Sequence, residues 1–181
     1  MPRLAALALA LLALLPLGCD RGGGAGDQAA PPSASTASEG VLWLSYGDGV
    51  ARAAAEGKPM LIDFWTDWCH WCKVMDKDTY GNSDIRRQLA QRFIAIKVDA
   101  ESDRPQGGAG SPTGVELARS FGVASYPTTW FVDSQGEKIA PLPGFVPPEQ
   151  FGFILDYIGS AAYKTQTFSA YQASRGATPS G

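Results

Sequence analysis

The amino-acid sequence predicts an α/β domain in which a central mixed β-sheet is flanked by helices. Three observations lead to this fold class. The chain has 181 residues, 45% hydrophobic and 18% charged, a composition typical of one globular domain with some residues to spare. Short apolar runs of strand length alternate with segments of helical spacing, which favours parallel strands. The pattern ends in a hairpin and a helix, and the hairpin adds antiparallel pairing.

The first elements follow from alanine content and from one long apolar run. Residues 50–56 are rich in alanine and precede Gly57, which predicts a short helix with a glycine stop. The continuous apolar run 59–65 predicts a strand covered on both faces, as in a parallel sheet. Residues 69–80 have helical spacing, so the strand is expected to lead directly into a helix.

The middle of the chain contains two capped helices and a second strand. Asn82 can cap a helix that places Ile85 and Leu89 on one face, and residues 93–98 predict the next strand. The residues from Thr113 to Glu116 form a capping box at the start of a further helix. The glycine-rich insertion 104–114 lacks the pattern of a phosphate-binding loop and is expected to be a flexible loop.

The last elements are a hairpin and a final helix. Residues 128–132 and 137–140 flank a turn and predict two antiparallel strands. The pair Pro147-Pro148 begins a last helix with apolar residues along one stripe. Beyond it, Phe168 and Tyr171 can dock onto the domain, whereas the end of the chain is expected to fray.

The N-terminal region predicts export rather than a folded element. A basic start and a short apolar run, too short to span a membrane comfortably, indicate a secretory signal over residues 1–18. The alternative to this signal is a buried N-terminal helix. Gly18-Cys19 resembles a bacterial lipoprotein signal, which implies lipidation of Cys19; without lipidation the protein would be secreted. Residues 19–40 are poor in apolar side chains and predict a flexible tether, followed by a domain over 41–163 and a tail over 164–181.

Charge and histidine content exclude several classes of function. The net charge is −3, so binding of nucleic acid through a strong positive field is not expected. The chain has one histidine, which excludes most multi-histidine metal sites. We expect no cofactor and no resident metal.

The segment Cys69-His70-Trp71-Cys72 has three interpretations. At a strand-to-helix junction it favours a redox dithiol, because unpaired amides and the helix dipole stabilise a thiolate at the first cysteine. A structural disulfide would close only a very small loop and stabilise the fold little. A metal site would have two thiolates and His70, and would lack a fourth ligand.

Two motifs resemble the thioredoxin superfamily. The segment from Asp63 to Lys73 is similar to its active-site segment, and Val123 to Thr128 is similar to its cis-proline loop. The resemblance covers about residues 41–163, and residues 58–63 resemble the C-terminal periplasmic domain of the DsbD electron-transfer family. The Cys-His-Trp-Cys centre also resembles a thioredoxin-like family with a C-H-W-C-H motif, in which Lys73 would replace the second histidine.

The resemblance implies a role for each of five residues. Cys69 would be the attacking thiolate, which requires it to be reachable from solvent, and Cys72 would be the resolving thiol. Asp63 would be a buried proton acceptor for Cys72. Pro127 would follow a cis peptide bond, and Tyr126 would offer its backbone to an extended substrate segment.

The charged residues within the two apolar strands support part of this assignment independently. A carboxylate at Asp63, inside an apolar run, is costly unless it is paired or useful, and burial should raise its pKa. Lys97 interrupts the next strand in the same way and can face Asp63. The alternative for this pair is a purely structural ion pair.

Residues around the cysteines are candidates for substrate contact. Trp65, Trp68 and Trp71 can form an apolar rim around the thiols, with Trp71 exposed; for Trp65 the favoured alternative is a position in the core. His70 has two interpretations that the sequence leaves equal: a cation that stabilises the thiolate of Cys69, or an exposed neutral residue with little effect.

Together these features predict a lipid-anchored, extracytoplasmic thiol–disulfide oxidoreductase that acts through Cys69 and Cys72, with a preference for reduction or electron relay. Its partners would be proteins with disulfides or thiols, together with a membrane electron donor. A disulfide oxidant or isomerase on the same fold is the first alternative. A non-catalytic binding module or assembly factor is the second.

Overall fold

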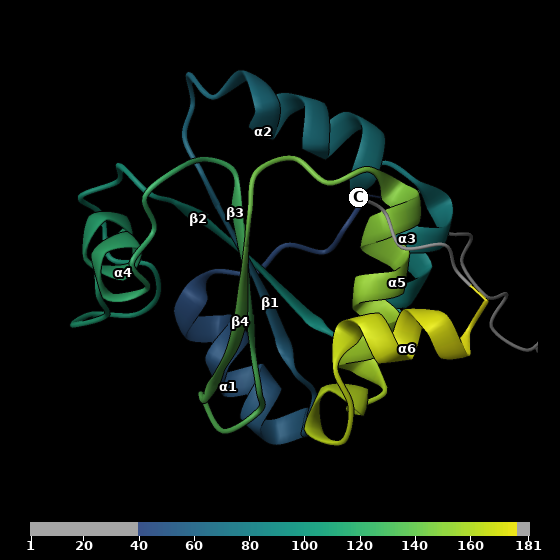
Figure 1. Cartoon of the computed structure of the whole chain (residues 1–181). Coiled ribbons are helices and arrows are strands. Elements are labelled where there is room, and N and C mark those ends of the chain that lie inside the picture. Colours follow the sequence, from purple (N-terminus) through teal and green to yellow (C-terminus); the bar gives the residue numbers. More distant parts are fainter. Residues whose placement is uncertain (1–39, 177–181) are drawn as a thin grey trace, which may run out of the picture. The chain divides into compact units, whose positions relative to one another are not determined.

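The computed structural model describes residues 40–176. A four-stranded sheet with the order β2-β1-β3-β4 forms the centre (Figure 1). β1 pairs with β2 in parallel and with β3 in antiparallel orientation, and β3 pairs with β4 in antiparallel orientation. The predicted mixed sheet is therefore confirmed. The strands are β1 (Met60–Trp65), β2 (Ile94–Asp99), β3 (Thr128–Val132) and β4 (Lys138–Pro143).

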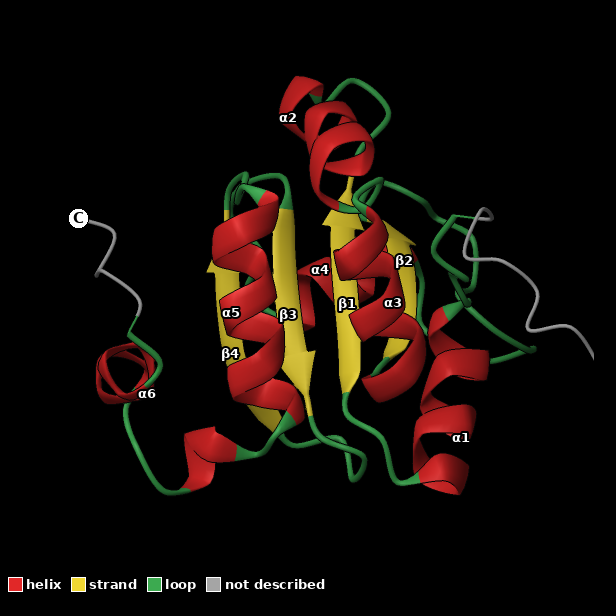
Figure 2. Ribbon diagram, turned by 90° about the vertical axis from the view of Figure 1, so that its right-hand side faces the viewer, coloured by secondary structure: helices red, strands yellow, loops and turns green. Residues whose placement is uncertain are grey.

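Helices cover both faces of this sheet. Figure 1 shows α3 and α5 on one face and α1 and α4 on the other, while α2 lies across the top of the strands. Figure 2 shows α3 and α5 in front of the strands and α4 behind them. The helical elements are α1 (Tyr46–Glu56), α2 (His70–Val74), the π-helix η1 (Met75–Thr79), α3 (Ser83–Arg92), α4 (Gly114–Ser120), α5 (Pro148–Gly159), the 3-10 helix η2 (Ala162–Lys164) and α6 (Phe168–Ser174).

β1 supplies side chains to two separate hydrophobic cores. Ile62 and Phe64 pack with residues of α1 and α4 on one face, whereas Leu61 packs with residues of α3 and α5 on the other. The apolar part of the strand is buried on both faces, as its continuous apolar sequence predicts. β1 therefore ends, at Trp65, in the centre of the domain rather than at an edge.

The helix starts follow the capping signals in the sequence. Asn82 accepts hydrogen bonds from the amides of Asp84 and Ile85, and Thr113 forms a reciprocal capping box with Glu116. α1 begins earlier than its alanine content predicts, because the Ser45 side chain caps the helix. Two glycines in this first turn weaken the sequence signal; one of them, Gly49, lies so close to Ile96 that a Cβ there would overlap that side chain.

The C-terminal region contains one helix that the sequence does not predict. α6 packs on α5, and the rings of Phe168 and Tyr171 lie 5.3 and 5.4 Å from the ring of Tyr157. The expected docking of these two aromatic residues is confirmed. The sequence indicates a tail here because α6 has only seven residues, too few to show a clear apolar periodicity. A helix this short is stabilised by packing rather than by intrinsic propensity.

β4 forms one edge of the sheet and has an unusual sequence for a strand. Pro141 and Pro143 are exposed and lie two residues apart, so both backbone nitrogens face the same direction. The amide of Gly144 donates inward to the carbonyl of Pro127. By alternation, the two prolines face outward from the sheet.

The insertion between β2 and α4 returns to the start of α1. The amide of Gly47 donates to the carbonyl of Gln106 over 2.7 Å, and Pro105 forms a β-bridge with Thr113. Within residues 40–176, no helix is long and apolar enough to cross a membrane. The predicted signal over 1–18, the lipidation site Cys19 and most of the predicted tether lie outside the described residues.

Candidate active site

The two cysteines form a disulfide across the first turn of α2. Cys69 is the N-cap residue of this helix, and its Sγ accepts a hydrogen bond from the amide of Cys72 over 3.1 Å. The two Cα atoms are 5.3 Å apart. A sulfur in this position faces the unpaired amides and the positive end of the helix dipole, which stabilise a negative charge on it. The local geometry therefore favours the thiolate form of Cys69 once the disulfide is reduced.

Both sulfur-bearing residues are buried in the disulfide form. Cys69 and Cys72 each expose 3% of their surface. The expectation that Cys69 is open to solvent is thus wrong for this redox state. The disulfide holds the Cys69 side chain back over the helix terminus, where the Cys72 amide contacts it.

Asp63 lies on β1 directly beneath the cysteine segment and is almost fully buried. Its Oδ1 atom has no hydrogen-bond partner. Burial disfavours the charged carboxylate and raises the pKa of Asp63 to about 7, while the positive charge of Lys97 acts in the opposite direction. The predicted burial and raised pKa are confirmed. Asp63 can therefore gain or lose a proton near neutral pH.

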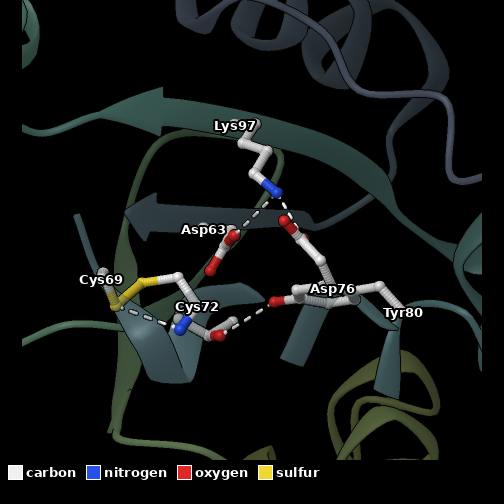
Figure 3. A network of polar contacts seen from close by, with 7 residues as sticks. Asp63, Cys69, Cys72, Asp76, Tyr80 and Lys97 are labelled. Carbon is white, nitrogen blue, oxygen red and sulfur yellow. Dashed lines mark hydrogen bonds and ion pairs between the residues drawn. A yellow bond between two sulfur atoms is a disulfide. The ribbon is translucent and has the colours of Figure 1, made fainter. Parts of the chain in front are cut away.

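Lys97 joins Asp63 to a second carboxylate that the sequence analysis does not identify. Its Nζ atom lies 3.7 Å from Oδ2 of Asp63 and also forms a short ion pair with Asp76 (Figure 3). Because Asp63 and Lys97 are register partners on parallel strands, their side chains share one face, as predicted. The carboxyl group of Asp63 points into the region between Lys97 and the disulfide in Figure 3.

Asp76 and Tyr80 follow Cys72 at intervals of four residues. A pure α-helix, with 3.6 residues per turn, would rotate such positions progressively away from one face. η1 is wound more loosely, as the hydrogen bond from the amide of Tyr80 to the carbonyl of Met75 shows, and this compensates for the rotation. The four-residue spacing from Cys72 to Asp76 is a signal in the sequence, because positions i and i+4 of a helix share one face.

Tyr80 completes the buried polar cluster. Its hydroxyl forms a 3.2 Å hydrogen bond with Oγ1 of Thr129, which is the β3 register partner of Asp63. Burial, and next the negative charge of Asp63, raise the pKa of Tyr80 well above its ordinary value. Tyr80 therefore remains a neutral hydroxyl beside the carboxylate.

Two exposed tryptophans flank the cysteines in the chain. Trp68 and Trp71 expose 66% and 54% of their surface. The indole N–H of Trp68 donates to Glu101 over 3.0 Å, and its ring lies 6.0 Å from that of Tyr126. His70 is exposed, with its ring 5.5 Å from that of Trp71.

A shallow groove of about 350 Å³ lies on one side of this rim, lined by Trp71, Tyr126, Gly144 and Phe145. The Tyr126–Pro127 peptide bond is cis, as the resemblance implies. The sequence does not indicate Gly144 and Phe145 as lining residues. The ring of Phe145 lies 5.6 Å from that of Trp71, so these two aromatic residues form one continuous apolar surface.

The expected core position of Trp65 is wrong. Trp65 is the last residue of β1 and is partly exposed, with the Nζ atom of Lys97 5.4 Å from the centre of its ring. The ring thus contacts a charged group rather than an apolar core. Among residues 40–176, no group of three or more histidine, cysteine, aspartate or glutamate side chains is arranged to hold a metal ion.

Comparison with known proteins finds a matching domain family and several similar proteins. Residues 46–159 match the thioredoxin-like domain family. The chain is 34% identical over 101 residues to thiol:disulfide interchange protein DsbD of Yersinia pestis (strain Pestoides F), covering 55% of this chain and 16% of that protein. It is 31% identical over 143 residues to DsbD of Ralstonia nicotianae, covering 77% of this chain and 22% of that protein. The chain thus spans about one fifth or less of the length of these relatives.

Solved structures share the fold of this chain. A thioredoxin-fold protein from Helicobacter pylori has a TM-score of 0.58 and 26% identity, covering 64% of this chain and 83% of its own. A thioredoxin from Thermus thermophilus has a TM-score of 0.57 and 28% identity, covering 68% of this chain and 93% of its own. From the family match and the site geometry, we conclude that this chain belongs to the thioredoxin-like domain family.

Proposed function

We propose that the protein is an extracytoplasmic thiol–disulfide oxidoreductase whose Cys69–Cys72 dithiol reduces disulfides in other proteins. The observation that carries this proposal is the disulfide across the first turn of α2, above a buried carboxyl group with a pKa of about 7. A disulfide that closes so small a loop stabilises the fold little, so its position at the helix terminus favours a chemical role.

The proposed reaction proceeds through a mixed disulfide. The Cys69 thiolate attacks one sulfur of the substrate disulfide, and the other substrate sulfur leaves as a thiolate. Cys72 then gives its proton to the carboxylate of Asp63, and the Cys72 thiolate attacks the Sγ atom of Cys69. The second substrate sulfur leaves as a thiolate. Two electrons have passed from the dithiol to the substrate, and the Cys69–Cys72 disulfide has formed.

The direction of electron flow is the finer part of the proposal. Similarity to the DsbD proteins, which are named for thiol–disulfide interchange, supports a reductase or relay. A positive charge on His70, the residue after Cys69, would favour the opposite direction, because it would stabilise the reduced form. The reduction potential of the Cys69/Cys72 pair distinguishes a reductase from an oxidant. A value near −270 mV is expected for the reductase, whereas one near −120 mV would indicate an oxidant.

A trapping experiment tests the reaction itself. In Cys72→Ser, the mixed disulfide on Cys69 cannot be resolved, so partner proteins should accumulate as reducible adducts that mass spectrometry can identify. The matched control is Cys69→Ser/Cys72→Ser, which should form none. If Cys72→Ser captures no partner in cells and the double variant supports normal function, the protein is a binding module or assembly factor instead.

The proposed location rests on the N-terminal sequence. Residues 1–18 would direct export, lipidated Cys19 would hold the protein at the membrane, and residues 19–40 would tether the domain over 41–163 near a membrane electron donor. The resemblance of residues 58–63 to the C-terminal periplasmic domain of the DsbD family supports an extracytoplasmic setting. Radiolabelled palmitate should label the protein but not Cys19→Ser. Failure to label the unaltered protein, with a control lipoprotein labelled, would remove the anchor from the proposal.

A further inference from the structure

The segment just before α1 runs along the outer edge of β2. The amide of Leu44 donates to the carbonyl of Ala95 over 3.0 Å, and the amide of Lys97 donates to the carbonyl of Leu44 over 3.2 Å. Leu44 forms a parallel β-bridge with Ile96. These contacts fix the position of the preceding residue, Trp43, beside the strand that holds Lys97.

Trp43 covers the polar cluster beneath the disulfide. The Nζ atom of Lys97 lies 5.0 Å from the centre of the Trp43 ring, and the ring of Tyr80 meets it edge-on at 4.9 Å. The centre of the Trp65 ring lies 5.4 Å from the same ammonium. Lys97 is therefore held by two indole rings and by the carboxylates of Asp63 and Asp76.

This arrangement matters most for Asp63, whose carboxyl group is incompletely hydrogen-bonded. Its Oδ1 atom is buried without a partner, so any water that entered would solvate it directly. Lysine is strongly hydrated, and a less covered ammonium would bring water toward the carboxylate. A half-buried indole provides a large apolar surface and attracts the cation at the same time.

We propose that Trp43 is a positioning residue of the dithiol site, whose ring keeps water away from the Lys97–Asp63 pair. The charged and titratable groups around Asp63 are Lys97 from β2, Asp76 and Tyr80 from the helix that follows the cysteines, and Cys72 in the proposed mechanism. Trp43 adds no charge to this set. Its contribution is to maintain the low hydration that keeps Asp63 able to hold a proton near neutral pH.

The test is a titration of the Asp63 carboxyl carbon by NMR in the full chain, in both redox states, with Asp63→Asn used to assign the signal. Trp43→Ala should lower the titration midpoint by about 0.5–1 unit, because water then solvates the carboxylate. Trp43→Phe should restore at least half of this shift. If Trp43→Ala does not fold, Trp43→Leu, which covers less surface than Phe, should titrate below Trp43→Phe.

Trp130 offers a matched control. It is also half-buried and carries a lysine over its ring, with the Nζ atom of Lys138 5.5 Å from the ring centre, but it packs in the core on the opposite face of the sheet. Trp130→Ala should leave the Asp63 midpoint unchanged. An unchanged or raised midpoint in Trp43→Ala, or an equal shift in Trp130→Ala, would overturn the proposal.

The kinetic consequence rests on the proposed function, whereas the titration does not. With insulin as the disulfide substrate, the pH profile of reduction by Trp43→Ala should move to lower pH with the Asp63 midpoint. A shifted midpoint with an unshifted profile would leave the inference about Trp43 intact. It would instead argue against Asp63 as the proton acceptor of Cys72.

Discussion

The two faces of β1 differ in kind although the strand is one continuous apolar run. On the face of α1 and α4, Ile62 and Phe64 belong to a buried hydrophobic core. On the face of α3 and α5, Leu61 belongs to a second hydrophobic core. On that same face Asp63 lies beside Lys97, and its Oδ1 atom has no hydrogen-bond partner. One face thus stabilises the fold, and the other gives up stability to hold a titratable group beneath the disulfide.

The largest effect is expected on the apolar face. Phe64 is fully buried, with its ring 5.4 Å from that of Phe121. Phe64→Ala should lower the free energy of unfolding by about 3–5 kcal/mol, because it removes buried surface and leaves a cavity. Denaturant unfolding of the oxidised protein measures this. The rate of disulfide reduction per folded molecule should change less than tenfold; a larger loss would mean that this face also serves the reaction.

Asp63→Asn tests the cost of the polar face. Unfolded, the Asp63 carboxyl loses its proton near pH 4; folded, it keeps it to about pH 7. Between these values unfolding releases a proton, so the stability contributed by the protonated group is present below pH 4 and is lost as pH rises to about 7. The variant lacks this loss. The free energy of unfolding of the variant, minus that of the unaltered protein, should therefore increase by up to about 4 kcal/mol between pH 4 and pH 7.

A constant difference between these two proteins from pH 4 to pH 8 would contradict the raised pKa of Asp63. The same variant should slow resolution of the mixed disulfide by about 100-fold at pH 7, because the proton acceptor is missing. Stopped-flow measurement of the resolving step separates this effect from the attack by Cys69.

Lys97→Met sharpens the comparison by changing the charge on the polar face alone. The positive charge of Lys97 lowers the pKa of Asp63, so its removal should raise the titration midpoint of that carboxyl by about one unit. Lys138→Met is the control, since Lys138 lies 4.4 Å from the centre of the Phe121 ring on the other face. NMR titration of both variants should find a shift only for Lys97→Met, and equal shifts would argue against the Lys97–Asp63 contact.

The smallest effect is expected at the edge of the polar cluster. Tyr80→Phe removes the hydroxyl that bonds to Thr129 but keeps the ring contacts with Trp43 and Phe151. The free energy of unfolding should fall by about 1 kcal/mol. Thr129→Val and the double variant complete a thermodynamic cycle. Strictly additive effects would mean that the hydrogen bond contributes nothing measurable.

The sequence predicts those parts of the fold and site that depend on local pattern. The apolar run of β1, the caps at Asn82 and Thr113, and the exposed position of Trp71 are all confirmed. The pairing of Asp63 with Lys97 is also predictable, because a charge interrupts each of two neighbouring buried strands. Each of these predictions rests on local patterns: a cap, an apolar run, or a charge within an apolar run.

The remaining features depend on contacts between distant segments. Asp76 reaches Lys97 through an ion pair between segments 21 residues apart in the chain. Trp43 joins the site through pairing of its segment with β2, which no periodicity indicates. Hydrophobicity favours the core for Trp65, but its position at a strand end beside a lysine leaves the ring partly exposed. Residue type alone does not show which of these side chains lie at the site and which lie in the core.

The outward prolines of β4 have a consequence for self-association. An open sheet edge can recruit a strand from another molecule, and this is a common start of aggregation. Pro141 and Pro143 provide no amide hydrogen at two successive outward positions, so a foreign strand would find acceptors there without matching donors. This edge is thereby protected against sheet extension between copies of the protein, even at high local concentration.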